Sequence, residues 1–299
     1  DDEYNINAKV GDRVVVYKTF DNYGSDEMQL QYYISDVDKR IELYIMGIGF
    51  IVLVLLIARK NGLKALFALI VTIAFIIKIF IPAIYNGYSP IFFAIITTIF
   101  SSLVTIYFTV GMNKKFVVAL LGVTSGVLIA GILSYLFTYR MRLNGFLDSD
   151  LLASAYLLKN IKIKELIPAG VIIGSLGAVM DVAVSITSSI NELHETDPNM
   201  SKKSMFKSAI NIGNDIIGTM INTLILAYIA SSIFTLLLIY IQANEYPLIR
   251  ILNFQDIAVE IMRSICGSIG ILIAVPLTAY IGTLIYKKKM KIYSKRKQP

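Results

Sequence analysis

Two apolar segments in the C-terminal half of the chain each carry a stripe of polar residues at helical spacing. The first stripe consists of Asp181, Ser185, Ser188 and Glu192, and the second of Asn211, Asp215, Gly218 and Asn222. Within each stripe the positions recur at i, i+4, i+7 and i+11, so a helix places them on one side. A carboxylate among lipid-depth residues costs roughly 3 kcal/mol or more, so both stripes are candidates for function.

Carboxylates in this setting are suited to moving protons or cations. Burial in an apolar medium disfavours the charged form of a carboxylate and brings its proton exchange towards neutral pH. Neighbouring hydroxyl and amide groups could hold a chain of water between the acids. Four glycines, Gly174, Gly177, Gly213 and Gly218, are expected to let the two helices approach closely. The predicted ion or proton pathway comprises Asp181, Ser185, Ser188, Glu192, Asp215, Thr219, Asn222 and Glu260.

A purely structural interpretation competes with this one. Polar stripes on adjacent spans can hydrogen-bond helices together, at about 0.6 kcal/mol per pair. Neutral side chains would suffice for that purpose, so the acids favour function. Asp256, Glu260 and Arg263 also share a helix face and can be read either as an internally paired stripe or as part of a polar pathway.

The composition predicts an all-α polytopic membrane protein. Hydrophobic residues make up 56% of the 299 residues. Several apolar runs reach the roughly 20 residues that a helix needs to cross a bilayer. The predicted transmembrane helical domain covers residues 41–286, with about seven spans near 41–58, 64–85, 90–111, 115–138, 165–188, 213–241 and 255–286.

Residues 1–40 are polar and predict the end of a small β domain outside the membrane. Val14 to Phe20 is β-branched and aromatic, Met28 to Ile34 alternates with period two, and turn residues separate them. Two strands alone are marginal in water, so the rest of this domain is expected upstream. The absence of an initial methionine also indicates that the chain has been trimmed.

The distribution of basic residues predicts the orientation. Residues 287–299 hold seven Lys and Arg and no acid, which is typical of a cytoplasmic tail that contacts anionic lipid. Basic pairs on alternate loops agree, and leave residues 1–40 outside. Residues 139–164 do not fit this orientation, because this predicted external loop carries five basic residues. Within the loop, the apolar stretch 147–158 suits an interfacial helix. No nucleic-acid-binding module accompanies the basic tail.

Neither a metal centre nor a cofactor is predicted, and the chain is not expected to be an enzyme. The single cysteine, Cys266, and the single histidine, His194, provide no ligand cluster, and His194 is expected in a solvated loop. No phosphate-binding loop is present. Two helix-borne aspartates are also found in intramembrane aspartyl proteases, but Gly213-Asn214-Asp215 lacks the Gly-x-Gly-Asp pattern of those enzymes.

The local sequence around the acids resembles a known family. Three stretches resemble the YibE/F-like family of bacterial multi-spanning membrane proteins, namely Gly174 to Leu193, Asn211 to Tyr228 and Gly11-Asp12-Arg13-Val14. This resemblance covers nearly the whole chain. It implies the bacterial plasma membrane, an N-terminal anchor helix and an extracytoplasmic β domain ending in residues 1–40, but it defines no biochemical activity.

A more distant similarity concerns SecF and one half of RND-type permeases. Three segments follow one another in the same order as in those proteins, namely Asp181-Val-Ala-Val, Ser208 to Thr223 and the small-residue-rich last span. The loops also match a five-helix C-terminal bundle. The resemblance implies intramembrane acids that carry protons to drive movements outside the membrane. An Asp-Arg pair typical of SecF is missing after Asp181.

Two functional hypotheses follow from these observations. The first is a membrane transporter or transport-driving protein coupled to protons or another cation. The alternative is a non-catalytic membrane receptor or assembly factor that presents a β domain outside the cell. The transported ion or substrate is undefined, and the partner can be a second copy of the chain or another membrane protein.

Overall fold

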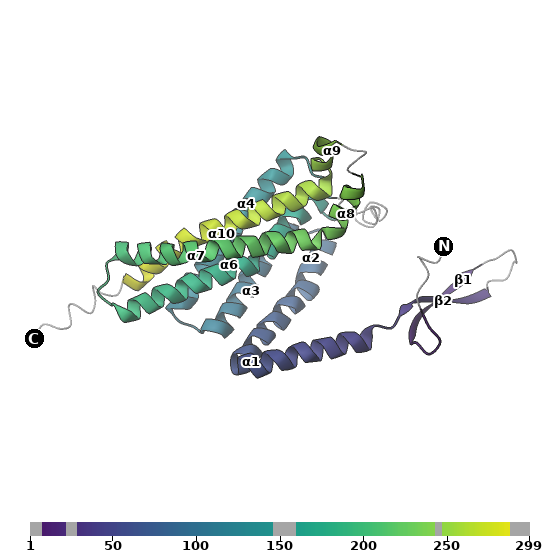
Figure 1. Ribbon diagram of the computed structural model, residues 1–299, viewed down its shortest axis with the longest axis horizontal. Helices are drawn as coiled ribbons and strands as arrows, with labels where there is room; N and C mark the ends of the chain where they lie inside the picture. The colour runs from purple at the N-terminus through teal and green to yellow at the C-terminus, as the bar shows by residue number, and fades with distance from the viewer. Residues whose placement is uncertain (1–7, 22–28, 146–159, 243–246, 288–299) are drawn as a thin grey trace, which may run out of the picture. The chain divides into compact units, whose positions relative to one another are not determined.

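The computed structural model describes residues 8–21, 29–145, 160–242 and 247–287, mostly as helices (Figure 1). The chain divides into two compact units, Asp1–Leu66 and Phe67–Pro299. The elements are β1 (Val14–Asp21), β2 (Gln29–Val37), α1 (Arg40–Phe75), a π-helical turn (Ile76–Phe80), α2 (Ile81–Tyr85), α3 (Pro90–Val110), α4 (Lys114–Arg140), α6 (Ile163–Thr196), α7 (Lys202–Ser231), α8 (Ile233–Gln242), α9 (Leu248–Leu252) and α10 (Gln255–Lys287).

The first unit contains the two predicted strands as an antiparallel hairpin. Val14 pairs with Val37 at the open end, and a bulge between Val15 and Val16 shifts the register. The rings of Tyr17 and Tyr33 stack at 5.5 Å between centroids, a cross-strand contact of the kind that stabilises paired strands. The described residues form a two-stranded sheet, and a hairpin of two strands is marginal by itself.

Helix α1 contains a sharp kink at Arg59. Its backbone there has φ 49° and ψ −127°, so two helical segments meet at this residue. A Cβ added to Gly62 would lie 2.7 Å from the carbonyl oxygen of Val54, which shows how closely the chain folds back just after the kink. The lack of a side chain at Gly62 therefore permits this turn.

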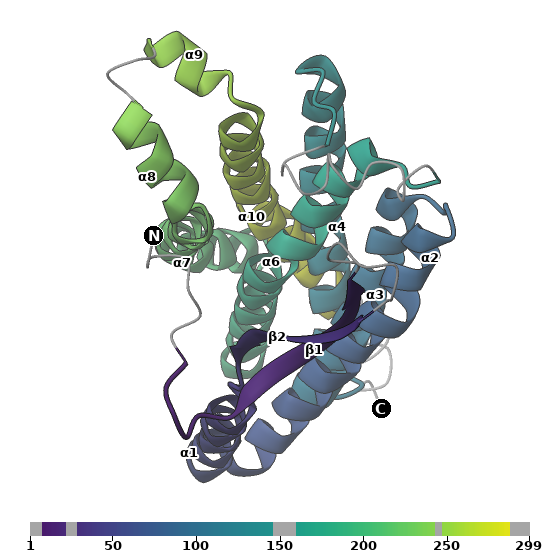
Figure 2. The same cartoon turned by 90° about the vertical axis from the view of Figure 1, so that its right-hand side faces the viewer.

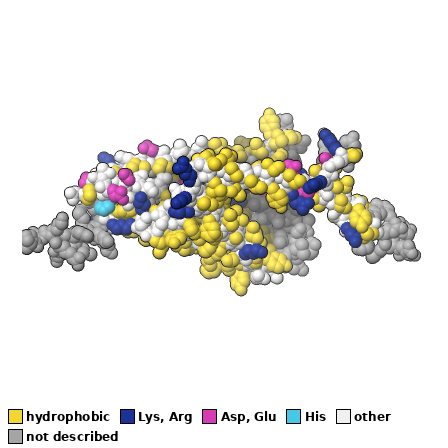
Figure 3. All heavy atoms as spheres, turned by 90° about the horizontal axis from the view of Figure 1, so that it is seen from below, with side chains coloured by type: hydrophobic (Ala, Val, Ile, Leu, Met, Phe, Trp, Pro, Cys, Tyr) yellow, Lys and Arg dark blue, Asp and Glu magenta, His cyan; other side chains and the backbone are white. Residues whose placement is uncertain are grey.

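Six helices are long and apolar enough to cross a membrane, counting only the described residues. They are Arg40–Tyr85, Pro90–Val110, Lys114–Arg140, Ile163–Thr196, Lys202–Ser231 and Gln255–Tyr286. The first covers two of the spans predicted from the sequence, because α1 runs through the kink. Hydrophobic side chains cover much of the surface shown in Figure 3. The chain is therefore a polytopic α-helical membrane protein.

Helix α7 begins earlier than the sequence suggests. The sequence predicts a span over 213–241, whereas α7 starts at Lys202, and α8 forms a separate helix after Ser232. The hydroxyl of Ser201 accepts a hydrogen bond from the amide of Ser204 at 3.1 Å and caps the helix at its N-terminus. Asp215 consequently lies more than three turns into α7, deeper than a span that starts at 213 would place it.

The centre of the second unit is formed by α4, α6 and α10, which pack against one another most extensively. Helix α3 packs on α4 and α6, while α7 packs on α6 and α10 (Figure 2). Gly126 of α4 lies where all three helices approach closely. A Cβ there would lie 2.8 Å from both Ala274 Cβ and Val179 Cγ1 and 2.9 Å from the carbonyl oxygen of Gly270. Small residues thus let these helices meet at backbone distance.

Some predicted features lie outside the described residues. They are most of the basic tail over 287–299, the apolar stretch 147–158 in the loop 139–164, and most of the turn between the strands.

We predict that Gly126→Ala lowers the stability of the helix bundle. The added methyl group has no room between α4, α6 and α10, and overpacking of this kind costs about 1–3 kcal/mol. Gly49→Ala in α1 is the matched control, because a Cβ at Gly49 meets nothing within 4 Å. Thermal unfolding in detergent should show a lower Tm for Gly126→Ala only. Equal Tm values for the two variants would contradict the packing described here.

We also predict an acid-sensitive contact where β2 joins α1. Arg40 donates hydrogen bonds from Nε and Nη2 to the two carboxylate oxygens of Asp38 at 2.8 and 2.7 Å. These bonds, with one from the Arg40 amide, lower the pKa of Asp38 from 3.8 to about 2. A lowered pKa means that the contact stabilises the junction above pH 3.8 and is lost as the pH falls through about 2.

An NMR titration of the Asp38 carboxylate carbon in the full chain tests this prediction. The wild-type midpoint should lie near 2, and Arg40→Ala should return the midpoint towards 3.8. A wild-type midpoint unaffected by the Arg40 substitution would show that the guanidinium does not hold the carboxylate.

Candidate functional site

The polar stripe of α6 lies on the exposed side of that helix. Asp181, Ser188 and Glu192 are exposed, and Ser185 is half-buried. The opposite side of α6 carries Val179, Ala183 and other fully buried residues that pack into the helix bundle. At 3.6 residues per turn the stripe lies roughly half a turn away from this buried side.

The polar stripe of α7 has the same arrangement. Its members Asn211, Asp215, Gly218 and Asn222, with the neighbouring Thr219, are all exposed. Met205, Ala209, Gly213 and Leu224 form the buried side of α7. Both stripes therefore point away from the packed interior of the chain rather than into it.

The carboxylates of the two stripes lack partners within the described part of the chain. Asp181, Glu192 and Asp215 form no hydrogen bond or ion pair with any described residue. Among the predicted hydroxyl groups, Thr219 donates to the carbonyl oxygen of Ile216 at 2.8 Å. Its hydrogen is thus engaged within its own helix, and the described residues of the two stripes do not form a closed polar pathway inside one chain.

Two of the glycines expected to bring α6 and α7 together do so, and two do not. Gly213 lies against Ile186 of α6 and Val275 of α10, and a Cβ at Gly174 would lie 2.9 Å from the hydroxyl of Tyr228. Gly177 and Gly218 face open space instead. The expectation of close packing at these last two positions was wrong for contacts within the chain, because both belong to the exposed stripes.

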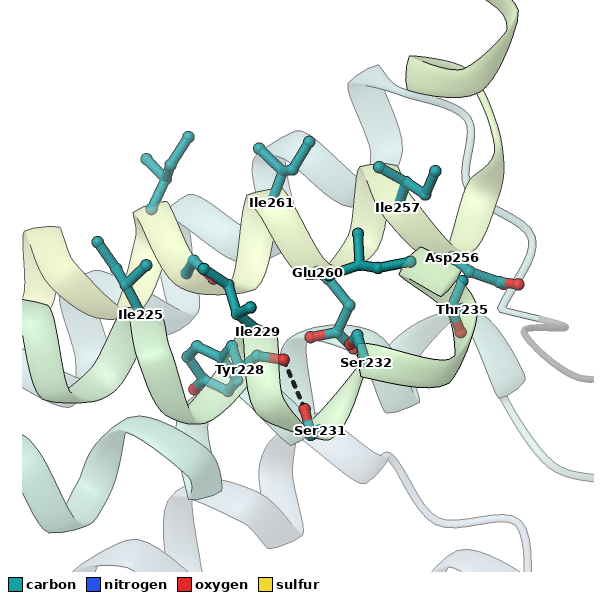
Figure 4. Close-up of a pocket in the computed structure, with 13 residues that line it drawn as sticks. Ile225, Tyr228, Ile229, Ser231, Ser232, Thr235, Asp256, Ile257, Glu260 and Ile261 are labelled. Carbon is teal, nitrogen blue, oxygen red and sulfur yellow. Dashed lines mark hydrogen bonds between the residues drawn. The ribbon is translucent and has the colours of Figure 1, made fainter. Parts of the chain in front are cut away.

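Glu260 lies in a different place, in a cavity between α7, α8 and α10 (Figure 4). The cavity has a volume of about 480 Å³. It is lined by Ile225, Tyr228, Ile229, Ser231, Ser232, Thr235, Leu236, Asp256, Ile257, Glu260, Ile261, Ser264 and Ile265. Apolar walls with a few polar groups are typical of ligand-binding cavities in proteins.

An ion pair joins Glu260 to Arg263. The Arg263 Nη1 donates to Glu260 Oε1 at 2.6 Å, and each side chain is about a quarter exposed, at 24% and 22%. The other oxygen, Oε2, is buried and points toward Ser232 without a well-formed hydrogen bond (Figure 4). One side of the carboxylate is therefore neutralised, and the other can accept a proton, a cation or a donor from a ligand.

Tyr228 connects this ion pair to α6 and α7. The guanidinium carbon of Arg263 lies 5.9 Å from the centroid of the Tyr228 ring, within the range of a cation–π contact. The buried Tyr228 hydroxyl and Arg263 Nε make no hydrogen bond to the described residues. The cluster thus combines a carboxylate, a guanidinium and a phenol at the meeting point of three helices.

A second polar cluster lies at the other end of the bundle. The Tyr286 hydroxyl donates to Asn191 Oδ1 at 2.9 Å, and Asn191 Nδ2 donates to Glu195 Oε1 at 2.7 Å. Lys114 Nζ lies 5.0 Å from the centroid of the Tyr286 ring. These contacts join α4, α6 and α10. His194 packs edge-on against the same ring at 5.3 Å, at the end of α6 and not in the solvated loop expected from the sequence.

Neither cluster resembles a metal centre. Within the described residues, no group of three or more His, Cys, Asp or Glu side chains is close enough to hold a metal ion. A monovalent cation or a proton could still use Glu260 with the nearby hydroxyls of Ser232 and Thr235. The sequence indicated the Glu260–Arg263 pairing through its i, i+3 spacing, but gave no signal for Tyr228, which reaches the pair from another helix.

We predict that Arg263→Met destabilises the protein and that Glu260→Gln restores part of the loss. Removing Arg263 leaves a partly buried carboxylate without its donor, which costs about 1–3 kcal/mol. The double variant replaces that charge with a neutral amide. Thermal unfolding of the two single variants and the double variant forms a cycle that isolates the pair. Strictly additive changes in Tm would contradict an energetic role for the ion pair.

Comparison with known proteins identifies a family. A family model described as YibE/F-like protein matches residues 46–288, which is most of the chain. Neither a search of curated proteins nor a search of solved structures found a match to this chain. The more distant similarity to SecF and RND-type permeases therefore stays a prediction from the sequence.

Proposed function

The chain belongs to the YibE/F-like protein family, and we propose that it transports a solute, or drives transport, by coupling to protons or another cation. The observation that carries this proposal is the cavity between α7 and α10, in which a partly buried carboxylate faces a guanidinium within membrane-spanning helices. Ionisable groups at such positions are rare and mark ion pathways in membrane proteins.

The Glu260–Arg263 pair provides a two-state element for coupling. In the proposed cycle, a proton or cation binds the carboxylate and competes with Arg263 for it. The released guanidinium still has a cation–π partner, because its central carbon lies 5.9 Å from the centroid of the Tyr228 ring. Because Tyr228 lies on α7 and Arg263 on α10, the exchange biases how these helices pack, and a ligand that prefers one arrangement shifts the population.

The proposed setting is the plasma membrane of a bacterial cell. The hairpin would lie outside and the basic C-terminal tail in the cytoplasm, where it would contact anionic lipid, as the distribution of basic residues predicts. Asp181 and Asp215 would extend the pathway if water or another protein covers their exposed stripes.

A membrane receptor or assembly factor is the second candidate, and one observation favours it. Asp181 and Asp215 lie on the outer sides of α6 and α7, apart from the cavity that holds Glu260. Exposed polar stripes suit an interface with another membrane protein better than a pathway through one chain. In this case the stripe acids would organise an assembly and would not contribute to flux.

We predict that Glu260→Gln abolishes cation-coupled flux while the protein stays folded. The amide cannot exchange a proton or neutralise a cation as the carboxylate does. Proteoliposomes that contain a pH-sensitive dye are given a proton gradient, and a parallel set receives a sodium gradient with a sodium-sensitive dye. The two sets distinguish which cation is coupled.

The matched control is Asp197→Asn, which removes a charge in the loop between α6 and α7. Asn can still accept the hydrogen bond that Asp197 Oδ1 accepts from the Asn199 amide at 3.0 Å. This control should retain wild-type flux. Absence of flux in the wild-type protein under both gradients would favour the receptor interpretation, and wild-type flux in Glu260→Gln would exclude this carboxylate as the coupling group.

A further inference from the structure

Helix α7 combines two properties that do not fit a helix surrounded by lipid. Of the six helices long enough to span a membrane in the described part of the chain, it is the least apolar, with a mean hydropathy of 1.4, and the least buried, at 11% of its most apolar window. A helix that faces acyl chains should be strongly apolar on its exposed side. The exposed side of α7 instead carries Asn211, Asp215 and Asn222.

The exposed stripe of α6 adds a second polar surface beside it. Asp181 and Glu192, like Asp215, have no partner among the described residues. Each charged group at lipid depth would cost roughly 3 kcal/mol or more. Both surfaces therefore need a polar cover that the described part of a single chain does not supply.

Contacts between the two helices set their antiparallel register. Gly213 of α7 lies against Ile186 of α6, while Leu224 and Ser175 both lie against Gly267 of α10. This register places Lys207 level with Glu192 and Asn211 level with Ser188. It places Gly218 level with Asp181 and Asn222 level with Gly177.

We propose that a second copy of this chain covers the two stripes, with α6 of each copy packed against α7 of the other. Two copies with the same membrane orientation are related by a twofold axis along the membrane normal, so each residue keeps its depth. Across such an interface α6 meets α7 at the levels just described, and the polar site around Asp181 and Asp215 is complete only when both copies contribute.

Residues at the same depth on α6 of one copy and α7 of the other are complementary in charge and size. Glu192 meets Lys207, so an acid faces a base at one end of the interface. Asp181 meets Gly218 with the hydroxyl of Thr219 next to it, and Asp215 lies at the depth of Ser185. No carboxylate therefore lies opposite another carboxylate at its own depth. A pairing of α7 with α7, in contrast, would bring the two copies of Asp215 to the same level.

The open glycines supply the close approach that such an interface needs. Gly177 and Gly218 have nothing within 4 Å of an added Cβ, although both lie in membrane-spanning helices. Small residues on helix surfaces let partner backbones approach in membranes, where packing and hydrogen bonds drive association. Their place within the polar stripes gives the same surface both the space and the hydrogen-bonding groups for a partner helix.

This inference does not depend on the proposed transport function, and its test measures association only. In a Cys266→Ala background, one chain carries Gly177→Cys and a differently tagged chain carries Asn222→Cys. Both chains are purified, reconstituted together in liposomes and oxidised. The proposal predicts a disulfide between the two tags as the main product, because these positions are level across the interface.

Two controls make the result decisive. Ile132→Cys on α4 replaces Gly177→Cys in the first control, since Ile132 is 58% exposed but lies outside both stripes, and it should give no cross-link. In the second, Asn211→Leu with Asn222→Leu removes two hydrogen-bonding side chains from the α7 stripe and should convert the dimer to monomer in nanodiscs, with cooperative thermal unfolding retained.

Three results would overturn the proposal. A folded wild-type protein that is monomeric in nanodiscs would show that lipid or water covers the stripes. Cross-linking no stronger than for Ile132→Cys would place the interface elsewhere. Association that requires addition of another membrane protein would identify a different partner for this surface.

Discussion

The arrangement of the second unit depends on the close approach of α4, α6 and α10. At Gly126 the backbones of α4 and α10 are so near that a single methyl group would clash with Ala274 and Val179 and with the Gly270 carbonyl. Such packing excludes water from the centre of the bundle, so charged groups cannot lie there without a large cost. The acids Asp181, Asp215 and Glu260 consequently lie at its edges, on the outer sides of α6 and α7 and in the cavity between α7, α8 and α10.

The sequence was informative about helices and about which residues share a face. Long apolar runs predicted a polytopic helical protein, and the 3.6-residue periodicity correctly grouped Asp181 with Glu192 and Asp215 with Asn222. Periodicity cannot tell which way a face points, because that depends on neighbours far away in the sequence. The sequence predicts buried acids inside the bundle, whereas the packed side of α6 is mostly apolar and Asp181 and Glu192 lie on its exposed side.

Helix boundaries and long-range contacts could not be predicted from the sequence either. The segment 202–212 reads as a polar loop because it contains three lysines, yet the Ser201 cap and an apolar side with Met205 and Ala209 make it the first turns of α7. The cavity was missed for a similar reason. Glu260 and Arg263 are neighbours on α10, but Tyr228 and Ser232 reach them only because α7 packs against α10.

Helix α7 contributes to both the cavity and the exposed stripes, which connects the two proposals physically. Tyr228 lies beside the ion pair near one end of α7, while Asn211 and Asp215 lie towards the other. As the least buried span, α7 can shift with the loss of fewer contacts than α4, α6 or α10. If occupancy of Glu260 alters the packing of α7 on α10, it must also alter the surface that a second copy covers. Thermodynamic linkage then requires the reverse, so that association changes the affinity of the cavity for its cation by the same factor.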